Sequence, residues 1–309
     1  MTTPFPKPSL SIADQIALLE QRGLVIADQA LATHCLKHIS YYRLRAYWYY
    51  FEIDPTDGSH LLQGGTTLEQ VLSLYDFDRK LRLLINDGIE RIEVAARGSW
   101  AHYQAMVHGP HGYLDDWHYS NADQFQRNVA QLTDEVERSH DTFIEHYNTK
   151  YGDPPFPPVW MVAEVMSFGL LSKFISLLGT RASRQGIARP LGLDERIFTS
   201  FLHHLGMVRN VCAHHGRLWN RRLTVTAMLP QNPPELAKSI DAGSPRRIYN
   251  TLVIMIYLMR NIAPVSDWGG RVVELLDSHP TGDLSAMGAP QDWRERPVWQ
   301  SIVAKPDCA

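Results

Sequence analysis

An arginine-rich segment with two adjacent histidines, RNVCAHHGRLWNRR, covers residues 209–222. Arg209 stands five positions before His214, and Asn210 directly follows the arginine. A histidine side chain titrates near neutral pH and can accept or donate a proton, whereas a guanidinium group stays charged and binds phosphate oxygens through paired hydrogen bonds. These residue types together are suited to acid–base chemistry on a phosphate group.

Helical periodicity predicts where the polar side chains of this segment point. At about 100° per residue, Asn210 and His214 share a helix face that points away from the core, so the asparagine can orient the imidazole. Arg209 lies between the two faces, and its long side chain reaches the same place. The apolar residues that recur at helical spacing and define the core side are Phe201, Leu205, Val208 and Cys212.

A second arginine–histidine pair, Arg97 and His102 in RGSWAH, repeats the spacing of the first. Each arginine follows an apolar residue of a helical stripe, so the two sets have the same helical phase. Gly98 stands where the first set has its asparagine, which leaves His102 without that partner. An ordinary structural alternative for Arg97 is a salt bridge with Glu93, one helical turn earlier.

Two such sets could cleave RNA with its own 2′-hydroxyl group as the nucleophile. One imidazole removes the hydroxyl proton, another protonates the leaving 5′-oxygen, and the guanidinium groups stabilise the charge that grows on the phosphate. His215 is an alternative to His214 as the working imidazole. The adjacent histidines point in different directions and have no carboxylate at ligand spacing, so we expect no metal and no cofactor. The side chains expected to bind RNA around the site are His215, Arg217, Arg221 and Arg222.

The densest aromatic stretch of the chain, HISYYRLRAYWYYF, covers residues 38–51 and contains Arg43 and Arg45. Aromatic rings alternating with arginines can stack unpaired bases and bind the phosphates between them, which makes both arginines candidate RNA-binding residues. Alternatively, aromatic side chains such as Tyr42 and Tyr49 bury one face of a helix.

The elements that must position these residues are expected to be helices, because helical periodicity dominates and no segment alternates with period two. Thr66 and Glu69 form a capping-box signature before a helix over about 67–107. The sequence predicts an all-α helical bundle, residues 66–309, with an N-terminal helical arm over 1–65. Further helices are expected over 121–148, after the proline-rich break at 153–158, from Asp194 as N-cap through the arginine-rich segment, and over 248–262.

Composition limits the class of protein. Thirty Lys and Arg against 33 Asp and Glu give a net charge of -3, which excludes a globally basic nucleic-acid binder, and acidic residues gather between 115 and 145. Three cysteines without CxxC spacing indicate neither a disulfide framework nor a zinc site. No apolar run approaches the ~20 residues of a membrane span. We therefore expect a cytoplasmic protein with no membrane partner.

The segment RNVCAHHGRLWNR resembles the signature of the Abi-like (abortive infection) family of bacterial phage-defence proteins, which is placed in the HEPN superfamily. The segments at 39–51, 75–97 and 157–174 support the resemblance. It implies an α-helical, HEPN-like bundle, and many such proteins are metal-independent ribonucleases whose Arg-x4-6-His motif forms a composite site with a second copy.

The resemblance assigns Arg209, Asn210 and His214 to this motif and suggests Arg97 and His102 as a second set. The second copy of the motif would come either from this pair within the chain or from a homodimer.

Three functional hypotheses follow. The first is a toxin-like, metal-independent endoribonuclease of phage defence, with RNA as substrate and an antitoxin-like inhibitor as a further partner. The second is a non-catalytic protein that holds a small non-coding RNA or regulates a defence system. The third is a protein-interaction module, suggested by the net charge and by the acidic segment over 115–145.

Overall fold

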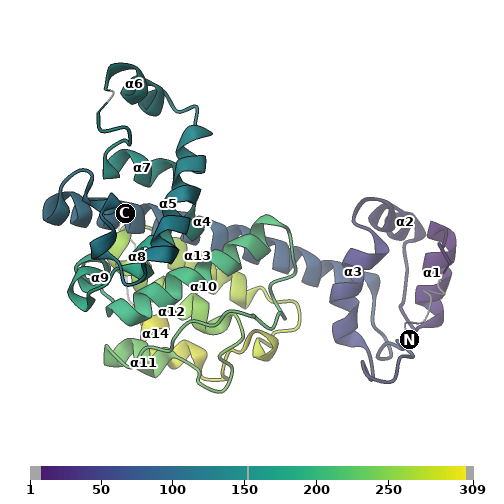
Figure 1. Ribbon diagram of the computed structural model, residues 1–309. Coiled ribbons are helices and arrows are strands. Elements are labelled where there is room, and N and C mark those ends of the chain that lie inside the picture. The colour runs from purple at the N-terminus through teal and green to yellow at the C-terminus, as the bar shows by residue number, and fades with distance from the viewer. Residues whose placement is uncertain (1–7, 152, 304–309) are drawn as a thin grey trace, which may run out of the picture. The chain divides into compact units, whose positions relative to one another are not determined.

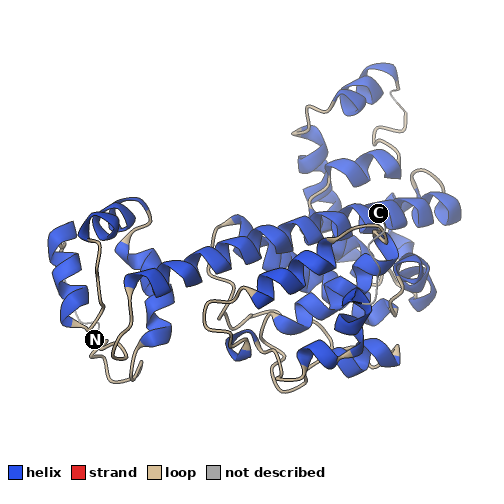
Figure 2. Cartoon of the chain, turned by 180° about the vertical axis from the view of Figure 1, so that it is seen from behind, coloured by secondary structure: helices blue, strands red, loops and turns tan. Residues whose placement is uncertain are grey.

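The computed structural model describes residues 8–151 and 153–303 of the 309-residue chain. Within these ranges every regular element is a helix, and extended segments meet only in isolated β-bridges (Figure 2). The predicted all-α fold is thereby confirmed. None of the described helices is long and apolar enough to span a membrane.

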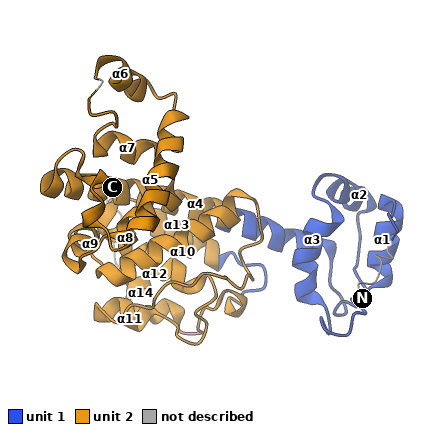
Figure 3. Ribbon diagram, viewed as in Figure 1, with its two compact units in different colours: residues 1–81, 277–282 blue, residues 82–276, 283–309 orange. Residues whose placement is uncertain are grey.

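The chain forms two compact units (Figure 3). Unit 1 comprises residues 1–81 and 277–282, and unit 2 comprises 82–276 and 283–309. The helix α4 (Leu68–His108) is continuous, with its first part in unit 1 and the rest in unit 2. The boundary expected from the sequence is at residue 65, directly before the capping-box signature that begins at Thr66.

Unit 1 begins with three short helices, and the third of them is formed by the aromatic stretch. Tyr47 is buried and donates a hydrogen bond to the Oδ2 atom of the fully buried Asp78 at 2.7 Å. Tyr42, by contrast, is 86% exposed, so the buried face of α3 is not the one that includes this tyrosine. The helices of this part are α1 (Ile12–Gln21), α2 (Gln29–His38), α3 (Tyr41–Trp48) and η1 (Tyr49–Phe51).

The capping box of α4 lies one residue later than the sequence signature suggests. The Thr67 hydroxyl accepts the N–H of Gln70 at 3.2 Å, and the Gln70 side chain accepts the N–H of Thr67 at 2.9 Å. Thr66 instead donates its hydroxyl to the carbonyl of Gln63. This pair of reciprocal bonds satisfies two main-chain donors at the start of α4.

Asn86-Asp87-Gly88 does not interrupt α4, which stays helical through these residues. A Cβ atom on Gly88 would lie 2.6 Å from the Trp268 ring, so the glycine allows that indole to pack directly against the helix. The Trp268 Nε1–H donates to the carbonyl of Leu84 at 2.8 Å. Glycine here serves close packing rather than a bend.

Unit 2 is a helical bundle that contains α10 (Glu195–Ala213) and the apolar α12 (Tyr249–Ile262), as Figure 1 shows. Residues 249–259 of α12 are all buried. The expected helix over 121–148 is two helices, which are separated at 138–141. The helix expected after the proline-rich break is also two helices, and Ser167 is the N-cap residue of the second, α8. The helices that follow α4 are α5 (Ala122–Glu137), α6 (Thr142–Lys150), α7 (Val159–Val165), α8 (Phe168–Leu177), α9 (Arg181–Ala188), α10 (Glu195–Ala213), α11 (Pro234–Ser239), α12 (Tyr249–Ile262), α13 (Trp268–Asp277) and α14 (Pro297–Val303).

The central helix α10 has the cap and the buried face that the sequence predicts. Asp194 accepts the N–H of Arg196 at 3.0 Å as the N-cap residue. Glu195 is buried, and Arg184 donates to its carboxylate at 2.6 Å. The four apolar residues that define the core side, all at most 2% exposed, are Phe201, Leu205, Val208 and Cys212.

His204 is buried in the core, on the same face of α10 as Phe201 and Val208. Its Nδ1–H donates to the carbonyl of Val225 at 2.7 Å, and its Nε2 accepts the hydroxyl proton of Thr251 at 2.8 Å. The imidazole therefore ties α10 to the 225 segment and to α12. Burial lowers the pKa of His204, so the ring is held in its neutral form.

We predict that His204→Ala lowers the free energy of unfolding by roughly 2–3 kcal/mol, because it leaves a buried carbonyl and a buried hydroxyl without partners. Urea unfolding of the purified protein measures this change. The adjacent His203→Ala, at an exposed position, is the matched control and should change stability by less than about 0.5 kcal/mol. Equal effects of the two substitutions would contradict the structural role of His204.

The same interaction predicts a pH dependence. The folded state holds His204 neutral, so the unfolded chain binds the extra proton more readily. The free energy of unfolding should therefore fall as the pH drops below about 6.5, the ordinary histidine pKa. His204→Ala should lose less stability over this range than the wild type. His108, whose pKa burial also lowers, contributes to both proteins alike.

Candidate functional site

A cleft of about 910 Å³ in unit 2 follows one face of α10 and continues onto α4, α7 and α8. It contains Arg209, Asn210 and His214 of the arginine-rich segment, together with Arg97 from α4. Three of the guanidinium groups that the sequence singles out, those of Arg97, Arg209 and Arg221, thus line a common space with the imidazole of His214. Cavities of this size are in the range of ordinary ligand sites, ~300–1,000 Å³.

The end of α10 determines where His214 lies. The helix ends at Ala213, and His214 is its C-cap residue, whereas the sequence predicts a helix that continues through the arginine-rich segment. The His214 main-chain N–H donates to the carbonyl of Asn210 at 3.0 Å. The hydrogen bond that joins these two residues is therefore a main-chain bond and not the predicted contact of the Asn210 amide with the imidazole.

A Schellman turn forms this helix end. His215 has a left-handed backbone, with φ of 56°, and its N–H donates to the carbonyl of Cys212 at 3.0 Å. The N–H of Gly216 donates to the carbonyl of Val211 at 2.8 Å. Glycine usually takes the left-handed position, but histidine tolerates it better than most residues. The turn reverses the chain directly after His214 and so leaves its side chain at the cleft.

Arg97 is held firmly at the cleft by two partners. Its guanidinium donates to the Glu93 carboxylate, with Nε at 3.2 Å from Oε1, and to the carbonyl of Ala163 at the end of α7. The side chains of Arg97 and Glu93 are only 12% and 18% exposed. The salt bridge considered as an alternative role is thus present, and the same arginine also faces Arg209 across a neighbouring cavity of about 350 Å³.

His102 does not reach the cleft that contains Arg97. It is exposed and is not among the residues that line this space. Five helical residues turn the chain by about 140°, so the two side chains of the pair leave α4 in different directions. On that side Ser99 donates to the carbonyl of Ile187 at 2.7 Å. The structure therefore brings together the first set and Arg97, but not the complete second set.

The other basic residues predicted to bind RNA are dispersed. Arg221 lines the cleft, and its Nη1 atom lies 3.5 Å from the position of a Cβ on Gly216, so it packs over the turn beside His214. The exposed His215 and Arg222 and the half-buried Arg217 are outside the cleft lining.

Arg43 and Arg45 belong to unit 1. Arg45 is 3.2 Å from the Nδ1 atom of His60 and 4.0 Å from the buried Glu52 carboxylate.

Two further polar residues of the cleft are not apparent from the sequence motif. His203 is exposed on α10 and lines the cleft, as does Lys173 of α8. The Lys173 ammonium donates to the side-chain oxygen of Gln131 at 3.0 Å. His203 precedes His214 by eleven residues, which is three helical turns within about 20°, so this spacing is the signal that could have placed both on one face.

The cleft is locally positive. Its described lining contains four permanently charged cations, namely Arg97, Lys173, Arg209 and Arg221, and two carboxylates, Glu93 and Glu164. The Glu93 carboxylate is already paired with Arg97. The N-terminal end of α8, from Ser167 to Gly169, also lines the cleft, but the main-chain N–H and the hydroxyl of Ser167 already donate to the Glu135 carboxylate, at 2.6 and 2.9 Å. Because its cations outnumber its carboxylates, the site can attract an anion such as a phosphate, although the net charge of the chain is -3. The described residues contain no group of three or more His, Cys, Asp or Glu side chains placed to hold a metal ion.

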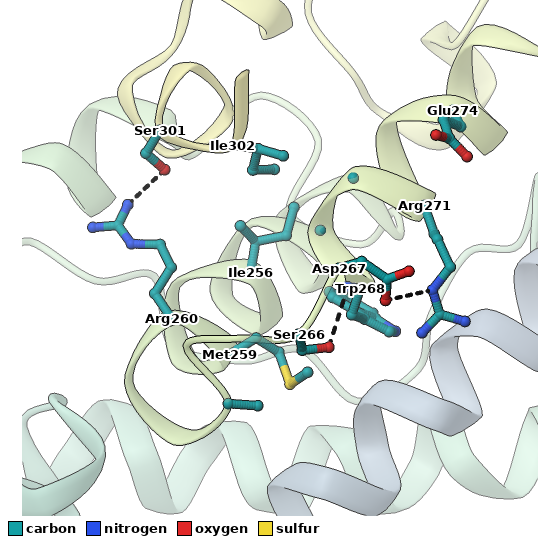
Figure 4. Close-up of a pocket in the computed structure, with 13 residues that line it drawn as sticks. Ile256, Met259, Arg260, Ser266, Asp267, Trp268, Arg271, Glu274, Ser301 and Ile302 are labelled. Carbon is teal, nitrogen blue, oxygen red and sulfur yellow. Dashed lines mark hydrogen bonds and ion pairs between the residues drawn. The ribbon is translucent and has the colours of Figure 1, made fainter. Parts of the chain in front are cut away.

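A different cavity, of about 510 Å³, lies between α12, α13 and α14 and is shown in Figure 4. Its charged groups mainly satisfy one another. Arg260 donates to Ser301 at 2.8 Å and to Glu235 at 2.9 Å, and Arg271 pairs with Asp267 at 3.2 Å. It contains no residue of either arginine–histidine set. This cavity therefore does not share the charge excess of the α10 cleft.

Comparison with known families gives one match. The sequence model for the Abi-like protein family matches residues 34–220, a range that includes both arginine–histidine sets, α4 and α10. No match was found among curated proteins or among solved structures.

The Schellman turn yields a stability prediction. His215→Gly should raise the free energy of unfolding by about 1 kcal/mol, because glycine adopts the left-handed backbone without a Cβ penalty. His215→Val should lower it by a similar amount or more, since a β-branched residue fits this conformation poorly. Chemical denaturation measures both. A destabilised glycine variant would show that the His215 side chain, rather than its backbone, maintains the turn.

Proposed function

The chain belongs to the Abi-like protein family, and we propose that it is a metal-independent endoribonuclease that acts in abortive infection, the defence of bacteria against phages. The observation that carries this proposal is the convergence of Arg97, Arg209 and His214 on one cleft. The match covers more than half of the chain and includes the whole Arg-x4-His segment. The resemblance of this segment to the HEPN motif supports the same chemistry.

The reaction proceeds by transfer of the RNA phosphate to its own 2′-hydroxyl group. A base takes the hydroxyl proton, the 2′-oxygen forms a bond to phosphorus, the bond to the 5′-oxygen breaks, and an acid protonates that leaving oxygen. The products are a 2′,3′-cyclic phosphate and a 5′-hydroxyl end. Arg209 and Arg97 bind the non-bridging oxygens and stabilise their charge in the transition state.

His214 serves as one of the two proton-transfer groups. Since His102 faces elsewhere, the other imidazole comes from the same segment of a second copy of the chain. This arrangement agrees with the composite sites that the HEPN resemblance implies. Arg221, packed over the turn beside His214, adds charge to the same site. An antitoxin-like inhibitor would suppress activity most simply by covering this cleft.

A second candidate function is RNA binding without catalysis, for example retention of a small non-coding RNA. The pairing of Arg97 with Glu93 and the carbonyl of Ala163 favours it, because this arginine already has partners without a substrate. Binding needs only the positive lining of the cleft, whereas cleavage needs a free imidazole at the phosphate. The substitution of His214 distinguishes the two functions.

We expect the purified protein to cleave end-labelled RNA in excess EDTA and to leave 2′,3′-cyclic phosphate ends. His214→Ala should lower the cleavage rate at least about 100-fold, because it removes a proton-transfer group. His140→Ala, at an exposed position outside the cleft, is the matched control and should cleave like the wild type.

Cleavage by His214→Ala at the wild-type rate would overturn the assignment of this residue. RNA that is bound by every variant but never cut would favour the non-catalytic function. Cleavage that appears only after addition of a divalent metal would contradict the proposed mechanism.

A composite site between two copies predicts a dominant effect of an inactive chain. Addition of His214→Ala in large excess to the wild type should reduce the activity per wild-type chain, because most wild-type chains then pair with an inactive one. The same excess of His140→Ala should not reduce it. An activity per wild-type chain that is independent of added His214→Ala would indicate that one chain suffices.

A further inference from the structure

The α10 cleft is longer than the site of a single phosphate group. Its lining on α10 begins at Leu202 and ends at His214, a distance of about 18 Å at 1.5 Å per residue. Arg209, Asn210 and His214 occupy one end of this length. The opposite end is formed by the middle of α10 and by α8, and contains His203 and Lys173.

His203 and His214 are on the same face of α10 but far apart along it. Eleven residues correspond to about 16 Å along the axis and to an angular offset of about 20°. Their imidazoles therefore line one cleft at points about 16 Å apart along α10, whereas atoms that bond a single phosphate lie within ~3 Å of its oxygens. His203 cannot be the second proton-transfer group for the phosphate at His214. Its contact with a bound strand must be at another nucleotide.

The chemistry at the far end suits a backbone phosphate. Lys173 presents an ammonium group, and its contact at 3.0 Å is with the neutral side chain of Gln131 rather than with a carboxylate. His203 is exposed and offers a second donor on the facing helix. Because the Gln131 amide is neutral, its hydrogen bond holds the Lys173 ammonium in place without cancelling the charge that an anion would meet.

The size of the cleft indicates the form of the strand. A volume of about 910 Å³ is at the upper end of small-ligand sites, and it suits a few nucleotides of one strand rather than a duplex. Proteins that recognise single strands combine a positive groove with contacts to successive nucleotides. The elongated cleft with a cationic group at each end has this form.

We infer that His203 and Lys173 form a second phosphate subsite, which binds the same single RNA strand more than one nucleotide away from the scissile phosphate. This inference rests on the proposed function and adds the substrate class, single-stranded RNA of several nucleotides. His203 and Lys173 are positioning residues here. They hold the strand so that the scissile phosphate meets His214 and the arginines.

The test uses short 2′-O-methyl RNA strands with one unmodified nucleotide, which is the only place where a 2′-hydroxyl can attack. Nucleotides are added one at a time on either side of it, and kcat/KM is measured for each length. For the wild type, kcat/KM should rise about tenfold when the added nucleotide supplies the second phosphate. This rise should occur on one side of the unmodified nucleotide only. A tenfold change is the size expected for one hydrogen bond to a charged group.

His203→Ala and Lys173→Met should lack this rise. His140→Ala is the control and should retain the rise. Lys173→Met should also reduce the dependence of log affinity on log salt concentration by about 0.7, the value for one phosphate contact on a single strand. The same rise with length in both variants as in the wild type would overturn the subsite.

Binding of fully 2′-O-methylated strands, followed by fluorescence anisotropy, separates this inference from the proposed function. If no strand is ever cut, the nuclease proposal fails. The subsite then stands if affinity increases at one length in the wild type and the increase is absent in His203→Ala. An affinity that is equal for wild type and both variants at every length overturns it.

Discussion

The termination of α10 at Ala213 is the constraint on which the candidate site depends. Had the helix continued, His214 would have been one of many side chains on a long solvated face. Instead the bonds from His215 and Gly216 back to Cys212 and Val211 close the helix and turn the chain. Leu218 and Trp219 are then buried at once, which anchors the following segment. His214 and Arg221 are neighbours at the cleft because the chain folds back here.

Two adjacent histidines of α10 differ in burial because one helical step turns the side chain by about 100°. His204 points inward and joins three segments through Val225 and Thr251, and burial keeps it neutral. His203, about 100° away around the helix, is exposed in the cleft. Identical side chains therefore have opposite surroundings. Stability of the bundle and chemistry at the cleft are carried by different faces of the same element.

Sequence periodicity is sufficient for the elements and faces that depend on local spacing. It gives the all-α class, the Asp194 cap, the buried face of α10 and the salt bridge of Arg97 with Glu93. The helix end at Ala213 is harder to predict, because a histidine occupies the left-handed position where glycine normally signals a stop. The displacement of the α4 capping box to Thr67 is a similar one-residue ambiguity.

Tertiary partners decide the rest. Helical spacing places His204 on the buried face with Phe201 and Val208, but its partners Val225 and Thr251 are distant in the sequence and cannot be read from a local pattern. The same holds for Lys173, whose place in the cleft results from the packing of α8 on α10. The roles of the arginine–histidine sets in RNA chemistry remain predictions, and the structure supports the set at Arg209 better than the pair at His102.

The contacts of Arg97 have a consequence for selectivity. A guanidinium fixed by Glu93 and by the carbonyl of Ala163 loses little conformational freedom when an anion arrives, so a ligand is met by a prearranged group. The carboxylate also cancels much of its charge at a distance. A small free anion gains little from such a neutralised pair, whereas a polymer that reaches Arg209, Arg97 and Lys173 together gains from all three. If the cleft binds RNA as proposed, the paired arginine would favour long polyanions over the abundant small anions of the cell.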